Sequence, residues 1–123
     1  MTQQEINEIT INGVAYVRKD AVRAAATDGD YPVYMVRTYS AGVFYGGLKS
    51  REGKEAVLVN ARRVWKWEGA ATLSQLAQSG TSRPSDCKFP EPVSEVTLTE
   101  AIELIPVTEA ALQTLNSVPV WKE

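Results

Sequence analysis

The sequence predicts an α+β fold, a single small domain (residues 1–123) built on an antiparallel β-meander with two or three short helices packed on it. The chain has 123 residues, of which 44% are hydrophobic and 23% charged, and a chain of this size and composition usually folds around one core. Apolar and polar residues alternate in several short segments separated by glycine, proline and polar turns, which is typical of paired strands. Two other segments space leucines at helical distance, which predicts helices.

The N-terminal part, residues 1–30, predicts a hairpin followed by a short helix. The segment "EITINGVAYV" alternates about Asn12-Gly13, a strong hairpin signal. It predicts strands at Glu8–Ile11 and Val14–Val17. Asp20 is a suitable N-cap for "AVRAAA", and we expect that helix to end at Asp28-Gly29, because glycine terminates helices.

A meander follows from Pro32 onwards. Residues 33–39 are rich in β-branched and aromatic side chains, Gly42 interrupts them, and residues 43–48 continue before the polar turn "SREGK" and a strand over residues 55–60; such runs favour strands. From residue 57 to 67 a period of two continues and assigns two faces. One face carries Val57, Val59, Ala61, Arg63, Trp65 and Trp67, and the other carries Leu58, Asn60, Arg62, Val64 and Lys66. A bulge near Asn60 would change which arginine lies on which face.

The C-terminal half predicts two helices separated by strands. The segment "AATLSQLAQSG" ends at Gly80, as a helix does, and the proline-broken loop "TSRPSDCKFPEP" follows. Thr108 is a suitable N-cap for the last helix, "EAALQTLNS", which precedes an extended tail, "VPVW". Between the loop and this helix, "VSEVTLTEAIELIPV" predicts one or two strands whose solvent-exposed side chains include Glu95, Glu100 and Glu103.

The histidine and cysteine content excludes several classes of catalytic and metal site. The chain has no histidine, which excludes Ser-His-Asp and Cys-His nucleophiles and HExxH zinc sites. Cys87 is the single cysteine, so an intrachain disulfide and a Cys-rich zinc site are excluded. We therefore expect a protein that is not an enzyme and has no catalytic residues, no metal site and no cofactor.

Charge and hydropathy indicate the compartment. The formal net charge of −2 argues against duplex DNA as a partner, since DNA binding usually needs a basic face. No segment approaches the roughly 18 apolar residues of a membrane span, and "MTQQEINEIT" lacks the features of a signal peptide. We expect a cytoplasmic protein with no membrane association.

Arginines and aromatic residues within the strands predict a nucleotide-binding pocket. Guanidinium groups match phosphate oxygens, aromatic rings stack on bases, and the amide of Asn60 could read a base edge. Arg37 shares a strand face with Val33 and Met35, so we expect a sheltered guanidinium that clamps a phosphate; a structural salt bridge is the alternative for each arginine. The expected ligand-binding residues are Arg37, Tyr39, Phe44, Asn60, Arg62, Arg63, Trp65, Trp67 and Arg83.

Four segments also carry a family resemblance: "VRTYSAGVFYGGL", "KEAVLVNARRVWKWEGAATLSQLAQSG", "RPSDCKF" and "LTEAIELIPVTEAA". From about Val36 to Trp121 the chain resembles a small phage-encoded family associated with the first type of Thoeris anti-defence protein. The resemblance implies a sponge that binds a nucleotide immune signal, a cyclic ADP-ribose isomer or a cyclic oligonucleotide, without degrading it. It also implies a homo-oligomer acting in the cytoplasm of an infected host cell.

Three other classes fit the same residues. A phage accessory protein could bind a host protein through the face that carries Trp65 and Trp67, because exposed tryptophans are effective interface anchors. An enzyme that degrades the same signal would have to use carboxylates, tyrosine, lysine or Cys87. A protein that binds single-stranded nucleic acid is disfavoured by the acidic net charge.

Overall fold

A computed structural model of the protein describes residues 8–11, 14–17 and 25–123. Strands β1 (Glu8–Ile11) and β2 (Val14–Val17) pair antiparallel, with Glu8 opposite Val17. This register confirms the predicted hairpin strands. The Asp20 cap and residues 20–24 of the predicted N-terminal helix lie outside the described residues.

The end of that predicted helix is extended, so the prediction is wrong over residues 25–28. Ala25 forms an antiparallel bridge with Thr108, and the buried Ala26 donates its N–H to the carbonyl oxygen of Val107 at 2.8 Å. Strand β3 (Thr27–Asp28) then pairs with the beginning of β4. Tertiary hydrogen bonding overrides the helix propensity of the alanines.

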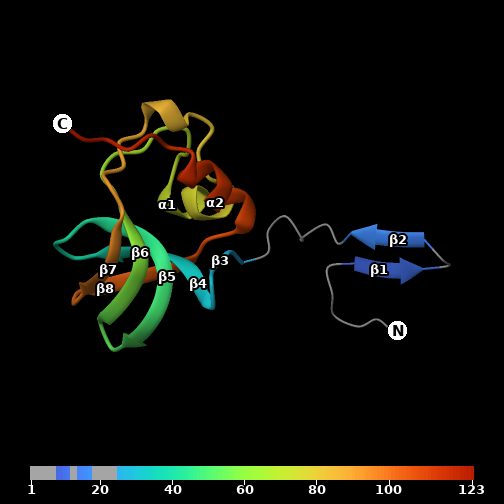
Figure 1. Ribbon diagram of the computed structural model, residues 1–123, viewed down its shortest axis with the longest axis horizontal. Helices are drawn as coiled ribbons and strands as arrows, with labels where there is room; N and C mark the ends of the chain where they lie inside the picture. Colours follow the sequence, from blue (N-terminus) through green and yellow to red (C-terminus); the bar gives the residue numbers. More distant parts are fainter. Residues whose placement is uncertain (1–7, 12–13, 18–24) are drawn as a thin grey trace.

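The other strands form one curled antiparallel sheet in the order β3-β4-β5-β6-β7. Strand β8 also pairs with β4, on the edge of β4 that faces away from β5. The predicted meander therefore holds up to β7 and ends there, because β8 pairs with β4 rather than with β7. Only Thr99 and Glu100 separate β7 from β8, so the two edges of the sheet approach each other (Figure 1). The long strands are β4 (Tyr31–Thr38), β5 (Val43–Glu52), β6 (Glu55–Val64), β7 (Val93–Leu98) and β8 (Ala101–Pro106).

The curled sheet separates two hydrophobic clusters. The strand cluster, which the curl encloses, consists of strand residues alone: Val36, Phe44, Ala56, Leu58, Ala61, Leu98 and Ala101. The helix cluster lies on the opposite face and joins buried residues of β4 and β5 to those of α1 (Leu73–Ser79) and α2 (Glu109–Asn116), which lie next to each other at one end of the sheet (Figure 1). Its largest fully buried side chains are Met35, Phe89, Leu76 and Leu115. This arrangement confirms, in outline, the predicted α+β fold.

The two helices begin at the side-chain caps that their sequences favour. The Thr72 hydroxyl accepts a hydrogen bond from the N–H of Gln75 at 3.0 Å, and the Thr108 hydroxyl accepts one from the N–H of Ala111 at 3.0 Å. The loop between α1 and β7 contains one short 3-10 helix, η2 (Pro84–Asp86). No helix in the described part of the chain is long and apolar enough to cross a membrane.

A bulge at Asn60 reverses the two faces of β6. Between the pairs Tyr45–Arg62 and Gly47–Val59 the register shifts, and Asn60 has a φ of 48°. Leu58 and Ala61, three residues apart, consequently both contribute to the strand cluster. The predicted period of two is therefore wrong beyond Asn60, in the way that the bulge would cause. Strand β6 also ends at Val64, so the predicted continuation to Trp67 is wrong.

Candidate functional site

A groove with a volume of about 680 Å³ lies where β6 ends, beside the loop that joins β4 to β5. We call it the tryptophan groove. It brings together three of the nine predicted site residues. Its lining residues are Ser40, Ala41, Gly42, Val43, Arg63, Val64, Trp65 and Trp67.

Short-range hydrogen bonds fix the loop that forms one rim of this groove. The Thr38 hydroxyl donates to the carbonyl oxygen of Gly42 at 2.7 Å and accepts from the N–H of Ala41 at 2.8 Å. Gly42 has a φ of +85°, a conformation that glycine adopts without strain. The Ser40 hydroxyl donates to the carboxylate of Glu100, which ties the loop to the β7–β8 connection. Hydrogen bonds within the loop and to the β7–β8 connection thus fix the position of this rim.

Arg63 lies between this loop and the enclosed face of the sheet. Its guanidinium carbon is 4.3 Å from the centroid of the Phe44 ring, and its Nη1 donates to the carbonyl oxygen of Ala41. A cation over an aromatic face is stabilised by the ring quadrupole. Within the described part of the chain, no carboxylate forms an ion pair with Arg63. Its charge is therefore oriented at the groove without being neutralised by a neighbouring acid there.

The two tryptophans of the groove have different surroundings. Trp67 is half-buried against the helix cluster, and its indole N–H donates to the carbonyl oxygen of Ala70 at 3.2 Å. Trp65 is 63% exposed and stacks on Trp121, with ring centroids 5.9 Å apart and an interplanar angle of 25°. Trp67 is consequently a fixed wall, while Trp65 offers a flat surface to solvent.

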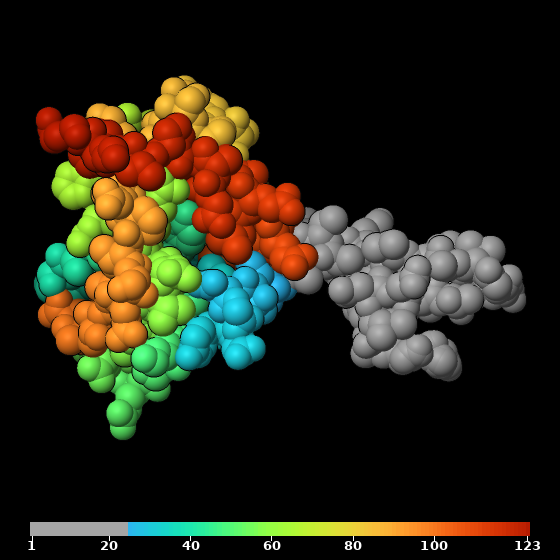
Figure 2. Space-filling view, in the orientation of Figure 1, coloured from blue at the N-terminus to red at the C-terminus, as the bar shows by residue number. Residues whose placement is uncertain are grey.

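Trp121 also contributes to this region, although the sequence predicts it only as part of an extended tail. The N–H of Trp121 donates to the carbonyl oxygen of Phe89 at 2.9 Å, and Lys88 Nζ lies 5.3 Å from the centroid of its indole ring. Figure 2 shows this C-terminal segment, in red, lying across the end of the molecule beside the yellow and orange loop that precedes β7. The aromatic residue at the end of "VPVW" was the only signal for this contact.

Arg37 is not in the groove, and the expectation of a sheltered guanidinium is wrong. Its side chain is 51% exposed, and its Nε donates to the Glu103 carboxylate at 2.8 Å. Val33 and Met35, on the same face of β4, are buried, so the covering layer ends before Arg37. Because β8 pairs with β4, Glu103 lies directly opposite Arg37. Arg37 thus follows the alternative that the sequence left open, a cross-strand ion pair.

Arg62 is buried and its donors are used inside the protein. Its Nε donates to the carbonyl oxygen of Pro90 at 3.0 Å, and Nη2 donates to those of Val118 at 2.9 Å and Phe89 at 3.3 Å. Nη1 donates to the Leu115 carbonyl oxygen at 3.4 Å. These bonds join the loop before β7 to the end of α2, a structural role.

The remaining predicted site residues are dispersed. Arg83 pairs with Asp86 at 2.9 Å and lies 3.8 Å from the Glu68 carboxylate. Phe44 is buried beneath Arg63. Asn60 donates to the Asp28 carboxylate and lines a different pocket from the groove. Tyr39 precedes the loop and is 80% exposed, but does not line the groove.

Comparison with known proteins identifies a family and nothing beyond it. A search of curated proteins and a search of solved structures each found no match. Residues 32–115, from β4 through nearly all of α2, match the family described as "Domain of unknown function (DUF6948)". Because the match covers more than half of the chain, this protein belongs to the DUF6948 family.

Proposed function

We propose that this protein binds a nucleotide signal in the tryptophan groove and sequesters it without chemical turnover. The proposed ligand is a cyclic ADP-ribose isomer or another cyclic nucleotide, and the proposed setting is the host cytoplasm during phage infection. The ligand class and the setting derive from the resemblance to anti-defence sponges. The tryptophan groove is the location that we propose for the bound ligand.

One observation carries the proposal: Arg63 alone among the four predicted arginines lines the groove and has no carboxylate partner in the described part of the chain. Arg37 and Arg83 are paired with acids, and Arg62 is bonded to backbone carbonyls. A guanidinium matches phosphate oxygens with two parallel hydrogen bonds. Arg63 is therefore the residue that we assign to a ligand phosphate.

The indole rings beside Arg63 provide aromatic surfaces for the base of a nucleotide. Trp65 presents an exposed ring, and Trp67 forms a wall of the same groove. Stacking of a base on an aromatic ring contributes about 1 to 3 kcal/mol. A phosphate at Arg63 and a base on Trp65 would use both groups at once.

Sequestration requires affinity and abundance. A binder present in excess lowers the free signal to about its dissociation constant, and a nanomolar constant corresponds to about −12 kcal/mol. A single small groove supplies only part of this free energy. We therefore propose a homo-oligomer in which a second copy of the chain covers the bound ligand, since enclosure at a subunit interface increases the buried area.

The proposal is tested by titrating cyclic ADP-ribose isomers into the wild-type protein and into Arg63→Ala, with calorimetric detection. We expect binding to the wild type and a loss of at least about tenfold in Arg63→Ala, because a charge-assisted hydrogen bond is removed. Arg83→Ala is the matched control, since it removes the same side chain from a site that has its own acidic partners.

The bound ligand is then released by heating and identified by mass spectrometry. Recovery of the intact ligand agrees with sequestration. Recovery of a hydrolysed product, where free ligand survives the same treatment, would instead assign the protein to the enzyme class. Absence of binding to any isomer would refute the nucleotide proposal.

A second candidate function is favoured by the Trp65–Trp121 stack. Two neighbouring indoles are 63% and 42% exposed, and Val120 beside them is 44% exposed. Such a patch is typical of protein interfaces, where tryptophans are frequent anchors. Nucleotides should raise the melting temperature only if they bind the folded state; a protein-binding module would show no such shift.

A further inference from the structure

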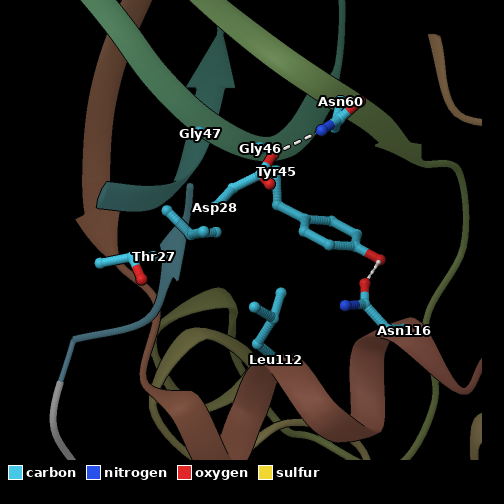
Figure 3. Close-up of a pocket in the computed structure, with 9 residues that line it drawn as sticks. Thr27, Asp28, Tyr45, Gly46, Gly47, Asn60, Leu112 and Asn116 are labelled. Atoms are coloured by element: carbon cyan, nitrogen blue, oxygen red, sulfur yellow. Dashed lines mark hydrogen bonds between the residues drawn. The ribbon is translucent and has the colours of Figure 1, made fainter. Parts of the chain in front are cut away.

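A second pocket, of about 280 Å³, lies between the middle of β5 and α2 and shares no lining residue with the tryptophan groove. We call it the Asp28 pocket. Figure 3 shows Asp28 and Asn116 at its two ends, with the ring of Tyr45 and the side chain of Leu112 on either side of the space between them. Its lining residues are Thr27, Asp28, Val33, Tyr45, Gly46, Gly47, Asn60, Leu112 and Asn116.

The Asp28 carboxylate is the one charged group among the described residues that line this pocket. Its Oδ2 accepts a hydrogen bond from Asn60 Nδ2 at 2.7 Å. A carboxylate oxygen accepts more than one hydrogen bond, so this contact orients the group without saturating it. The pocket therefore has a single negative charge with remaining acceptor capacity.

The position of Asn60 is specific to the bulge in β6. A φ of 48° at a residue other than glycine is uncommon, and it directs the Asn60 amide across β5 to Asp28. At the opposite end the Tyr45 hydroxyl donates to Asn116 Oδ1 at 3.0 Å. Both ends of the pocket are consequently held by side chains from different elements.

Three of the side chains between these ends are apolar or aromatic. Val33 and the Tyr45 ring are buried, Leu112 is half-buried, and Gly46 and Gly47 contribute backbone only. A hydrocarbon chain gains free energy by leaving water for such a surface. The pocket combines a carboxylate at one end with the apolar surfaces of Val33, Tyr45 and Leu112.

An adjoining hollow of about 250 Å³ shares Thr27, Leu112 and Asn116 with the Asp28 pocket. Glu109, in the first turn of α2, lines this hollow. The two hollows thus adjoin at the shared side chains, and each is lined by one carboxylate, Asp28 in the first and Glu109 in the second.

We propose that the Asp28 pocket and the adjoining hollow together bind a small aliphatic diamine. One ammonium group lies at Asp28, the hydrocarbon chain passes along Leu112, and the second ammonium group lies toward Glu109. An ammonium group has three donors and no acceptor, which matches the carboxylates and the acceptor oxygens of Asn60 and Thr27. This site is independent of the nucleotide proposed for the tryptophan groove.

The test uses three probes of equal chain length: 1,5-diaminopentane, 1-aminopentane and 1-pentanol, titrated calorimetrically. We expect millimolar or tighter binding of the diamine, weaker binding of the monoamine and none of the alcohol. Asp28→Asn should weaken both amines at least about tenfold, because it removes a charge-assisted hydrogen bond. Glu109→Gln should weaken the diamine alone.

Asp30→Asn is the matched control, because it makes the same change of charge two residues away at an exposed position outside the lining. It should bind both amines as the wild type does. Asp28→Asn keeps an acceptor for the Asn60 amide, and a thermal melt checks that the variant is folded. If Asp30→Asn weakened amine binding as much as Asp28→Asn does, the effect would come from net charge alone and the proposed site would be refuted.

Wild-type protein provides a test that needs no variant. In ¹H–¹⁵N spectra the amide signals of Gly46 and Gly47 should move with 1,5-diaminopentane and stay in place with 1-pentanol, since both glycines line the pocket. Shifts confined to other parts of the chain, equal shifts with the alcohol, or no shift at millimolar diamine would each overturn the proposal.

Discussion

Arg62 and Arg63, adjacent in β6, direct their guanidinium groups to opposite faces of the sheet. Arg62 lies in the helix cluster with its guanidinium carbon 5.3 Å from the Phe89 ring centroid, and Arg63 lies 4.3 Å from the Phe44 ring centroid. Arg62 is enclosed by backbone carbonyls, whereas Arg63 borders the tryptophan groove. Neighbouring residues of one type therefore have different surroundings. Arg62 has a structural role, and Arg63 is the residue for which we propose a ligand-binding role.

Arg62→Ala should lower the free energy of unfolding by about 3 kcal/mol, because buried carbonyl oxygens lose a charged donor. The affected carbonyls belong to Pro90, Phe89, Leu115 and Val118. Urea denaturation measures the change. Arg63→Ala is the control, and we expect it to lower the free energy by about 1 kcal/mol or less, the value of an exposed cation–π contact. Equal losses in the two variants would contradict the assignment of a structural role to Arg62.

Arg37→Ala should change the free energy of unfolding by about 1 kcal/mol or less, since exposed ion pairs contribute little. Arg37 and Glu103 are 51% and 41% exposed. The variant should also bind nucleotides as the wild type does, because Arg37 does not line the groove. Denaturation and calorimetric titration on this one variant check both statements. A selective loss of nucleotide affinity would return Arg37 to the site.

Local signals predict most of the strands, the end of α1 at Gly80 and the start of α2 at Thr108. The hairpin strands, the break at Gly42 and the Thr108 cap follow from residues that are near one another in sequence. Backbone conformation and capping depend on such neighbours. These elements could therefore be predicted from the sequence.

Features that depend on distant pairing could not be predicted in this way. The apolar strand neighbours of Arg37 predict a sheltered position, but its side chain is exposed and its ion-pair partner, Glu103, lies in β8, 66 residues away. Residues 25–28 were expected to be helical, and their contact with Val107 and Thr108 makes them extended. The Trp65–Trp121 stack likewise joins two segments that have no common local pattern.

Asn60→Val should destabilise the protein by about 1 to 2 kcal/mol more than Asn60→Gly. Asn60 has a φ of 48°, and the left-handed region carries a penalty of this order for a residue with a branched Cβ and none for glycine. Both variants lose the hydrogen bond to Asp28, so their difference isolates the backbone term. Chemical denaturation provides the comparison. A valine variant as stable as the glycine variant would mean that the bulge relaxes or moves.

Gly80→Ala should lower the free energy of unfolding by about 3 kcal/mol. Gly80 ends α1 with a φ of 77°, and an added Cβ would overlap Thr114 Oγ1 and lie 3.1 Å from the backbone of Ala111 in α2. Backbone strain of this kind contributes about 1 to 3 kcal/mol, and the overlap forces the helices apart. Gly53→Ala is the control, because φ is 60° there but no atom lies within 4 Å of the added Cβ. Similar melting temperatures for the two variants would contradict the close packing of α1 on α2.

The free energy of unfolding should fall as the pH rises above about 10, and Tyr45 should account for part of that fall. Burial raises the pKa of Tyr45 above its ordinary value of 10.0, and the nearby Arg62 only partly opposes this effect. Below pH 10 the folded and unfolded states both keep the Tyr45 proton, so Tyr45 does not make the free energy of unfolding depend on pH. Above pH 10 the unfolded chain loses this proton first. The unfolded chain then binds fewer protons than the folded protein, which lowers the free energy of unfolding. Urea denaturation over a range of alkaline pH should show a smaller fall in Tyr45→Phe than in wild type. Identical slopes in Tyr45→Phe and wild type would mean that the Tyr45 hydroxyl titrates as it does in the unfolded chain.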